Sequence, residues 1–395
     1  MRTIFLERLI FTSKLKEMSK SIKASKVQVR PKDEEVRIGR ATLGLGEAEN
    51  PSSRFERLKI GNDPLEESSF FKDEDPAPLP RTQVFRDFSK SILSTNDSPD
   101  IGFEFSINPY RGCEHGCIYC YARPTHEYLG LSAGMDFETK IFAKTDAARL
   151  LREKLNSSNW VPKPIFISGI TDCYQPLERK LRITRSIVEV LTEFRNPLAF
   201  ITKNHLVTRD VDLLKSMSEI NAVRGFISIT SLDPKLIERM EPRTSRPALR
   251  LKAIETLAKA GIPMGVMVAP VIPGLTDSEI PQILESARNA GAEWAGYTPV
   301  RLPYGVGTLF EAWLSQHFPD RKEKILNRIR EIRGGKINDP NFNTRMRGTG
   351  LYAEHLRSLF KLYTKKLGMN QISIELSTEH FQRPGEGKQF SLFQE

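Results

Sequence analysis

Cysteine is scarce in this sequence, with four residues in 395, and glycine and proline are not enriched, with 25 of each. So few cysteines exclude a disulfide scaffold, and this glycine and proline content excludes a collagen-like or low-complexity chain. Long apolar runs are also missing. The best candidate, residues 264–275, is broken by Pro270, Pro273 and Gly274 and falls short of the about eighteen apolar residues of a membrane helix.

The N-terminal segment is not predicted to be a secretory signal, because Glu7 and Arg8 interrupt its short apolar run. With no candidate membrane span and few cysteines, we expect a soluble, cytoplasmic protein without a membrane partner. A chain of 395 residues is long enough for one large domain or two ordinary ones.

Positive charge is concentrated in two regions, and the formal net charge of the whole sequence is +10. Residues 1–32 hold nine basic and two acidic residues, and residues 301–370 hold fourteen basic and six acidic residues. Clustered basic residues are typical of a nucleic-acid contact surface. A solvated tail is the favoured interpretation for residues 1–32. For residues 301–370, a nucleic-acid surface and an ordinary basic helical surface both stay open.

The first 95 residues are rich in charged residues, Ser, Pro and Gly. Such a composition cannot bury enough apolar surface to offset the entropy of ordering the chain. We therefore predict a largely disordered extension over residues 1–95, in which residues 54–56 (RFE) dock on the main domain.

From about residue 100, short β-rich runs alternate with amphipathic helical segments. Strands are predicted at residues 103–107, 164–168, 198–202, 226–229, 264–269 and 294–298, and helices at 145–155, 178–194, 210–220, 247–260 and 276–290. This alternation predicts an α/β fold with a parallel sheet, either a partial β/α barrel or a doubly wound sheet. In both folds, ligands bind at the carboxyl ends of the strands.

The remaining sequence is predicted to be mainly helical, with helices at residues 308–317, 321–333 and 351–367. The predicted organisation is therefore an extension over residues 1–95, a core over residues 96–305, a helical extension over residues 306–370 and a tail over residues 371–395.

Three of the four cysteines, Cys113, Cys117 and Cys120, fall within eight residues after the first predicted strand. A tight loop with three thiolates can hold three irons of a cubane iron–sulfur cluster, which leaves the fourth iron open to a chelating substrate or cofactor. A zinc site with His115 or His126 as fourth ligand is the main alternative. Structural zinc sites usually draw their ligands from two pairs of residues, each close together in the sequence and separated by a longer loop. This sequence has no second pair of that kind.

The Cys-x3-Cys-x2-Cys spacing, with Tyr119 before the last cysteine, resembles the signature of the radical S-adenosylmethionine (SAM) superfamily. The resemblance implies a partial (β/α)6 TIM-type barrel in which Cys113, Cys117 and Cys120 ligate a [4Fe-4S] cluster. It further implies that SAM chelates the open iron, and that one electron cleaves SAM to methionine and a 5′-deoxyadenosyl radical that abstracts a hydrogen atom. An electron donor such as a flavodoxin or ferredoxin is implied as a partner.

The flanking segments 108–113 (NPYRGC) and 120–123 (CYAR) resemble the subgroup related to spore photoproduct lyase, a DNA-repair enzyme. Segments 119–131 (YCYARPTHEYLGL) and 169–178 (GITDCYQPLE) resemble a bacterial branch of that subgroup. The resemblance covers about residues 100–300 and makes nucleic acid a candidate substrate. A radical SAM enzyme that modifies a protein or small molecule, and a non-enzymatic metal-binding interaction module, are the alternatives.

By the same resemblance, Tyr119 is expected to lie beside the SAM adenine, with an ordinary core aromatic residue as the alternative. The superfamily often holds the SAM amino group with Gly-Gly-Glu after the second strand, whereas this sequence has SGITD at residues 168–172. Thr171 and Asp172 are therefore the candidates, because an ammonium group needs oxygen acceptors. A plain turn or helix cap is the alternative for both residues.

Four more positions are candidates by resemblance. Lys203 ends the third strand and is expected to pair with the SAM carboxylate, with a surface lysine as the alternative. Ser228 and Thr230 end the fourth strand and are candidates to bond the SAM ribose or carboxylate, with ordinary strand-end residues as the alternative. Cys173 is a candidate hydrogen-atom donor, as in the photoproduct lyase, although an ordinary buried cysteine is the favoured interpretation.

Overall fold

Seven strands form the main sheet of the computed structural model, which describes residues 54–55, 81–373 and 375–384. They are β2 Leu93–Thr95, β3 Phe105–Ile107, β6 Ile165–Ile167, β7 Leu198–Thr202, β8 Val223–Ser228, β9 Met264–Val271 and β10 Trp294–Pro299. The order across the sheet is β10-β9-β8-β7-β6-β3-β2, and only β2 runs antiparallel to its neighbour. All six predicted strands are therefore present.

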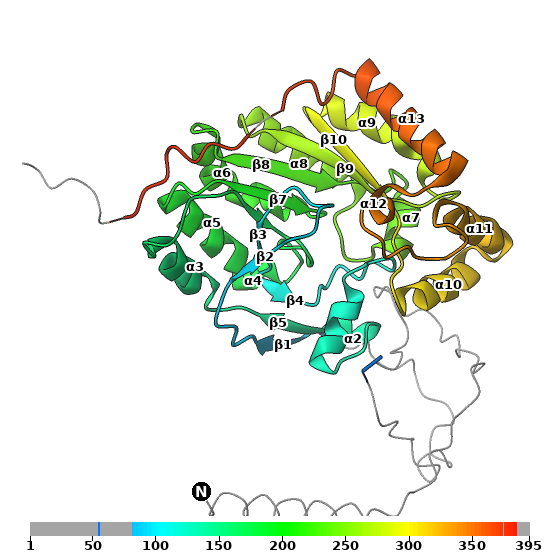
Figure 1. The fold of residues 1–395 in the computed structure, drawn as a ribbon, viewed down its shortest axis with the longest axis horizontal. Coiled ribbons are helices and arrows are strands. Elements are labelled where there is room, and N and C mark those ends of the chain that lie inside the picture. The colour runs from blue at the N-terminus through cyan, green and yellow to red at the C-terminus, as the bar shows by residue number, and fades with distance from the viewer. Residues whose placement is uncertain (1–53, 56–80, 374, 385–395) are drawn as a thin grey trace, which may run out of the picture. The chain divides into compact units, whose positions relative to one another are not determined.

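The strand order decides between the two predicted architectures. From β3 to β10, each parallel strand pairs with the next parallel strand along the chain. A doubly wound sheet would reverse its order at a switch point, where its ligand binds. This sheet has no such reversal, so it is a partial (β/α)6 barrel (Figure 1).

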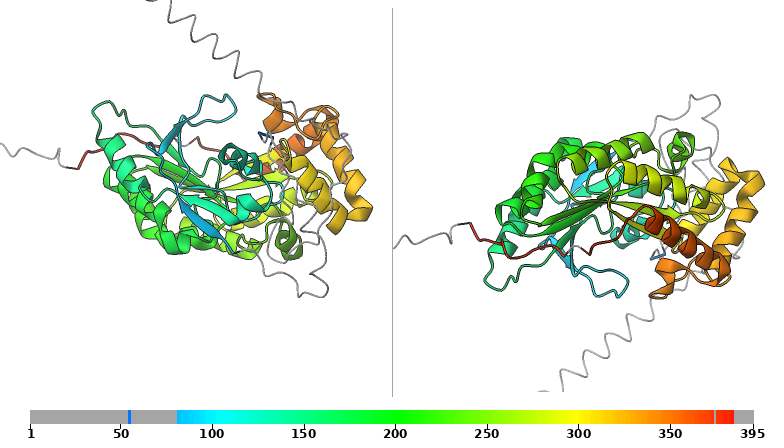
Figure 2. Two further views of the ribbon diagram at one scale, coloured as in Figure 1. Left: turned by 90° about the horizontal axis from the view of Figure 1, so that it is seen from below. Right: turned by 90° about the horizontal axis from the view of Figure 1, so that it is seen from above.

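The helices that connect the strands cover the outer side of the sheet (Figures 1 and 2). They are α3 Ala147–Asn156, α4 Glu178–Leu181, α5 Ile183–Glu193, η2 His205–Asp210, α6 Val211–Ser218, α8 Pro247–Lys259, η3 Asp277–Glu279 and α9 Ile280–Asn289. The short helix α7 Pro234–Met240 instead packs at the end of the barrel with the cysteine segment and α10. The helix predicted over residues 178–194 is divided at Arg182, which has a left-handed φ of 52°. Buried side chains such as Leu214 and Leu257 pack against Phe200 and Ile227 of the strands and form the main core.

A second, three-stranded sheet has the order β1-β5-β4, with β1 Gln83–Arg86, β4 Tyr110–Arg111 and β5 Lys140–Ala143. The sequence did not predict it, because strands of two to four residues are too short to show an alternating pattern. η1 Arg123–Leu129 and α2 Met135–Thr139 lie between β4 and β5. Since β1 and β2 precede residue 96, the folded core starts earlier than predicted, and residues 1–53 and 56–80 of the predicted extension lie outside the described residues.

The C-terminal region is helical, as predicted. It contains α10 Val306–His317, η4 Pro319–Arg321, α11 Lys322–Ile332, α12 Thr344–Arg347 and α13 Gly350–Lys366. Residues of α10 and α11 form a second core with Ile118, which is fully buried in the cysteine segment. Beyond α13, the backbone N–H groups of Ser377 and Gln382 donate to the carbonyls of Asn221 and Phe194, so part of the predicted tail is bonded to the barrel. No helix of the described residues is long and apolar enough to cross a membrane.

Candidate functional site

The three clustered cysteines share one loop at the carboxyl end of the barrel, after β3 and β4. Two glycines allow its tight course: Gly112 and Gly116 have φ values of +81° and +66°. A Cβ atom at Gly112 would lie 2.9 Å from Cε1 of His126, and one at Gly116 would lie 2.6 Å from Oε2 of Glu138. Both positions therefore require glycine, because an L side chain would be strained and would collide with its neighbour.

The thiols of this loop are sheltered from water. Cys113 and Cys117 are buried, Cys120 is partly exposed, and none of them forms a disulfide. Burial, followed by the charge of Asp172, raises the pKa of Cys113 to about 12. Burial also raises the pKa of Cys117 and of Cys120. A bound metal would reverse this preference, because metal coordination deprotonates a thiol.

The donor set fits a [4Fe-4S] cluster: three thiols on one loop, of which Cys113 and Cys120 lie beside the buried, apolar Ala122 and Phe137, and Cys117 lies in the second core. Among the described residues, no three His, Cys, Asp or Glu side chains are grouped to hold one metal ion. The two histidines considered as zinc ligands have other neighbours. Nε2 of His126 lies 2.9 Å from the carbonyl of Lys140, and Nδ1 of His115 lies 3.4 Å from Oδ2 of Asp172.

A buried charge network holds the backbone of the cysteine loop. Arg123 is fully buried, donates from Nε to the Cys117 carbonyl at 3.0 Å and pairs with Glu138 at 2.5 Å. The other oxygen of Glu138 pairs with Arg243 at 2.8 Å, and Arg243 donates to the carbonyl of Glu114. Two guanidinium groups sharing one carboxylate thus fix two carbonyls of the loop. We call Arg123, Glu138 and Arg243 the loop clamp.

Asp172 connects the loop to the ends of two strands. It follows β6, and it accepts hydrogen bonds from the Thr202 hydroxyl at 2.7 Å and from the Lys203 N–H at 2.8 Å, both at the end of β7. Its Oδ2 atom also faces His115 of the cysteine loop. Burial lowers the pKa of His115 to about 4, although Asp172 acts in the opposite direction. Near neutral pH the imidazole is therefore neutral.

Tyr119 connects the loop to β8. Its hydroxyl donates to Glu241 and lies 3.3 Å from that of Thr230, which donates to Glu241 at 2.7 Å. Glu241 is buried and also pairs with the fully buried Arg250 of α8. Burial alone would raise the pKa of Glu241, but Arg250, Lys203 and the two hydroxyl donors lower it to about 2.

The structure brings most of the predicted SAM-binding residues around this loop. The Nζ atom of Lys203 lies 5.9 Å from the ring centroid of Tyr119. Thr171 is buried and its hydroxyl donates to the carbonyl of Tyr110 at 2.8 Å. Ser228 is buried, and its carbonyl accepts a hydrogen bond from Arg250. Their binding roles remain predictions.

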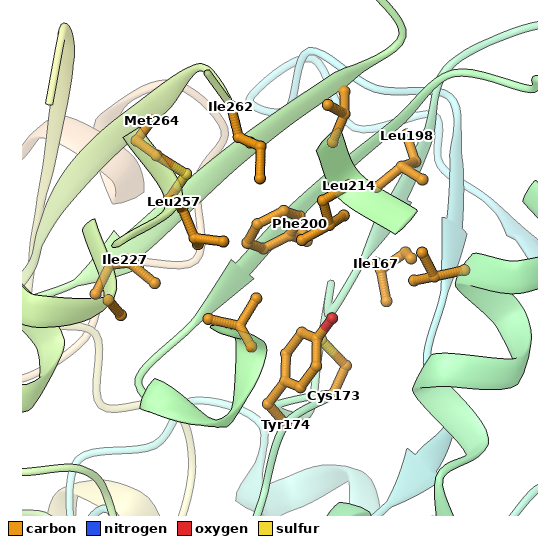
Figure 3. Packing of buried hydrophobic residues seen from close by; sticks show 14 of the residues in the cluster. Ile167, Cys173, Tyr174, Leu198, Phe200, Leu214, Ile227, Leu257, Ile262 and Met264 are labelled. Atoms are coloured by element: carbon orange, nitrogen blue, oxygen red, sulfur yellow. The ribbon is translucent and has the colours of Figure 1, made fainter. Parts of the chain in front are cut away.

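Cys173 lies apart from the other cysteines. Its side chain is fully buried in the main core with Tyr174, Ile167 and Phe200 (Figure 3). The Cys173 N–H donates to the hydroxyl of Ser168 at 2.9 Å. A hydrogen-atom donor must reach the substrate radical, so this position favours the buried-cysteine interpretation over the donor role.

Two features of the site were not found from the sequence. Glu138 of α2 and Glu241, which follows α7, anchor the loop, yet a glutamate in a sequence gives no signal that its side chain is buried. The docking of the upstream segment was predicted and is confirmed for its described part: Nε of Arg54 pairs with Glu127 at 2.9 Å, and its guanidinium lies 3.9 Å from the ring centroid of Tyr304.

Comparison with known proteins agrees with this geometry. Residues 107–287 match the family model of the radical SAM superfamily. An uncharacterized protein of Mycobacterium tuberculosis is 34% identical over 248 residues, which are 62% of this chain and 72% of that protein. One of Methanocaldococcus jannaschii is 30% identical over 227 residues, 58% of this chain and 81% of that protein. Spore photoproduct lyase complexed with dinucleoside spore photoproduct shares the fold, with a TM-score of 0.51, 17% identity and coverage of 72% of this chain and 80% of the lyase.

Proposed function

The chain belongs to the radical SAM superfamily, and from this premise we propose that it is an enzyme whose loop of Cys113, Cys117 and Cys120 holds a [4Fe-4S] cluster. When bound, such a cluster supplies one electron that cleaves SAM into methionine and a 5′-deoxyadenosyl radical for hydrogen abstraction. The observation that carries the proposal is the loop of three thiols, two of them buried, which the loop clamp fixes at the end of the barrel where ligands bind.

The residues of the chain itself have positioning roles in this proposal. The loop clamp keeps the three thiols at fixed places relative to the barrel. Lys203 extends from the end of β7 toward Tyr119 and supplies a positive charge for the SAM carboxylate. Asp172 and Thr230 hold the ends of β6 and β8 against the same loop. Burial of Cys113 and Cys117 limits the access of water to the site, and exclusion of water protects a reactive radical from side reactions.

Nucleic acid is the substrate that we propose. The basic residues of segment 301–370 support it, as does a fold neighbour that was solved with a dinucleoside. An external electron donor of the flavodoxin or ferredoxin type completes the reaction.

Anaerobic reconstitution tests the proposal. Iron and sulfide should each approach four per chain, reduction with dithionite should give a paramagnetic signal, and addition of SAM should yield 5′-deoxyadenosine. Zinc bound at one equivalent without sulfide, or a reduced cluster that never cleaves SAM, would contradict it.

A further inference from the structure

Arg301, at the carboxyl end of the barrel, has no carboxylate within ion-pair distance among the described residues, although the charges of Asp100 and Asp339 act on it. It follows β10 and is partly buried, and among the described residues its guanidinium forms no ion pair. Its Nε atom is buried without a hydrogen-bond partner, and its Nη1 atom lies 3.5 Å from the sulfur of Met346. A guanidinium group carries five N–H donors, and leaving buried donors unpaired costs free energy. The site is therefore suited to an incoming anion.

An exposed aromatic ring lies beside this arginine. The Cζ atom of Arg301 is 5.6 Å from the ring centroid of Tyr121, which directly follows Cys120. The Tyr121 hydroxyl donates to the Gly169 carbonyl at 2.7 Å, yet the residue is 48% exposed. A ring that is fixed at one end and open to solvent is a preformed stacking surface, and a neighbouring cation suits a phosphate.

The same pairing of arginine with an exposed ring recurs around the mouth of the barrel. Arg345 lies 4.3 Å from the ring centroid of Phe342, and Arg54 lies 3.9 Å from that of Tyr304. Phe342 is 52% exposed and Tyr304 is 69% exposed. Arg345 pairs with Asp100 and Arg54 pairs with Glu127, so these two stacks contribute exposed rings rather than net charge.

A hollow of about 300 Å³ continues this surface past α12. Arg347 and Arg357 line it together with one acidic residue, Glu354. Neither arginine forms an ion pair within the part of the chain that the structure describes. Arg301, Arg347 and Arg357 thus carry positive charge without an ion pair among the described residues, whereas Arg345 of α12 is paired.

We propose that this surface binds single-stranded nucleic acid, with Arg301 and Arg347 on phosphates and Tyr121 stacked on a base beside the cysteine loop. We call Tyr121, Arg301, Tyr304, Phe342, Arg345 and Arg347 the arginine–aromatic rim. The inference rests on the proposed function and specifies its substrate as an unpaired strand. Single strands are favoured over duplexes because exposed rings stack on bases that are free of pairing. An acidic protein segment would form ion pairs with the arginines, but it would offer no bases to stack on the aromatic rings.

Anisotropy of a fluorescein-labelled oligothymidine of about 20 nucleotides, titrated with the full-length reconstituted chain from about 50 to 200 mM salt, tests this inference. Arg301→Ala should weaken binding about tenfold and lower the salt slope by about one, and Arg301→Lys should keep that slope. Tyr121→Ala should weaken binding about tenfold with the slope unchanged, and Tyr121→Phe should bind like the parent. Arg149→Ala, which removes an exposed arginine on α3, is the matched control and should have no effect.

Three results would overturn the inference: no binding by the parent chain at about 50 mM salt, parental affinity in both alanine variants, or equal competition by polyglutamate. The last result would assign the surface to an acidic protein partner. If Tyr121→Ala does not fold, Arg301→Ala with its lysine control decides. Binding needs no SAM cleavage, so a chain that binds the strand but yields no 5′-deoxyadenosine refutes only the proposed function, and the reverse pattern refutes only the rim.

Discussion

The cysteine loop and the arginine–aromatic rim are neighbours at one end of the barrel, and they use arginine in opposite ways. In the loop, Arg123 and Arg243 are paired with a buried glutamate and donate to backbone carbonyls. In the rim, Arg301 is paired with no carboxylate of the described residues and lies against an exposed ring. A paired, buried arginine fixes the shape of a loop, whereas an unpaired one at the surface remains available to a ligand.

The largest effect is expected from substitution of a thiol in the cysteine loop. Cys117→Ala should lose cluster loading and all production of 5′-deoxyadenosine, because a cubane held at two corners is not retained. Iron and sulfide content, with chromatography of the nucleoside product, measures both effects. Cys173→Ala is the matched control and should keep the cluster and SAM cleavage, because Cys173 packs in the main core. Normal turnover by Cys117→Ala would refute the ligand assignment.

The next largest effect is expected from a substitution in the loop clamp. Glu138→Gln removes the shared counter-charge of Arg123 and Arg243, and it should lower the free energy of unfolding by about 3–5 kcal/mol. Urea denaturation of the purified chain measures the change. Glu153→Gln removes one partner of an exposed pair with Arg149 and should cost less than about 1 kcal/mol. Equal losses in the two variants would show that the clamp has no special role.

The hydroxyl of Tyr119 gives a smaller effect. Tyr119→Phe removes the hydroxyl donor to Glu241 and should destabilise the chain by about 1–2 kcal/mol, since the carboxylate keeps its bonds from Arg250 and Thr230. Tyr304→Phe, at a residue that is 69% exposed, should leave the urea midpoint in place. A midpoint for Tyr119→Phe that matches the parent would show that this hydroxyl does not stabilise the loop.

Substitution of Arg301 in the arginine–aromatic rim should lower the stability of the chain very little. Arg301→Ala removes a guanidinium that makes no ion pair among the described residues and whose buried Nε atom lacks a hydrogen-bond partner, so the free energy of unfolding should not fall by more than about 0.5 kcal/mol. The same urea titration measures it. A loss above about 2 kcal/mol would make Arg301 a structural residue like those of the loop clamp.

Much of the fold could be predicted from the sequence, because the patterns that indicate a strand or a helix lie within the few residues that form it. The strand at residues 198–202 is observed at those residues, and the other five strands and most helices lie within a few residues of their predicted positions. The small sheet of β1, β4 and β5 was missed because its strands are too short for a periodic pattern. The break at Arg182 was missed because no glycine or proline marks it.

The candidate cluster ligands Cys113, Cys117 and Cys120 could be found from the amino-acid sequence alone, because all three lie within eight residues. Which charged side chains meet is visible only in the folded structure. Glu138 and Arg243 are 105 residues apart, and Tyr119 and Glu241 are 122 apart, so their pairing depends on the order in which strands assemble. It also placed Cys173 in the core and left Arg301 unpaired beside Tyr121, because burial and pairing are properties of packed surfaces and not of sequence neighbours.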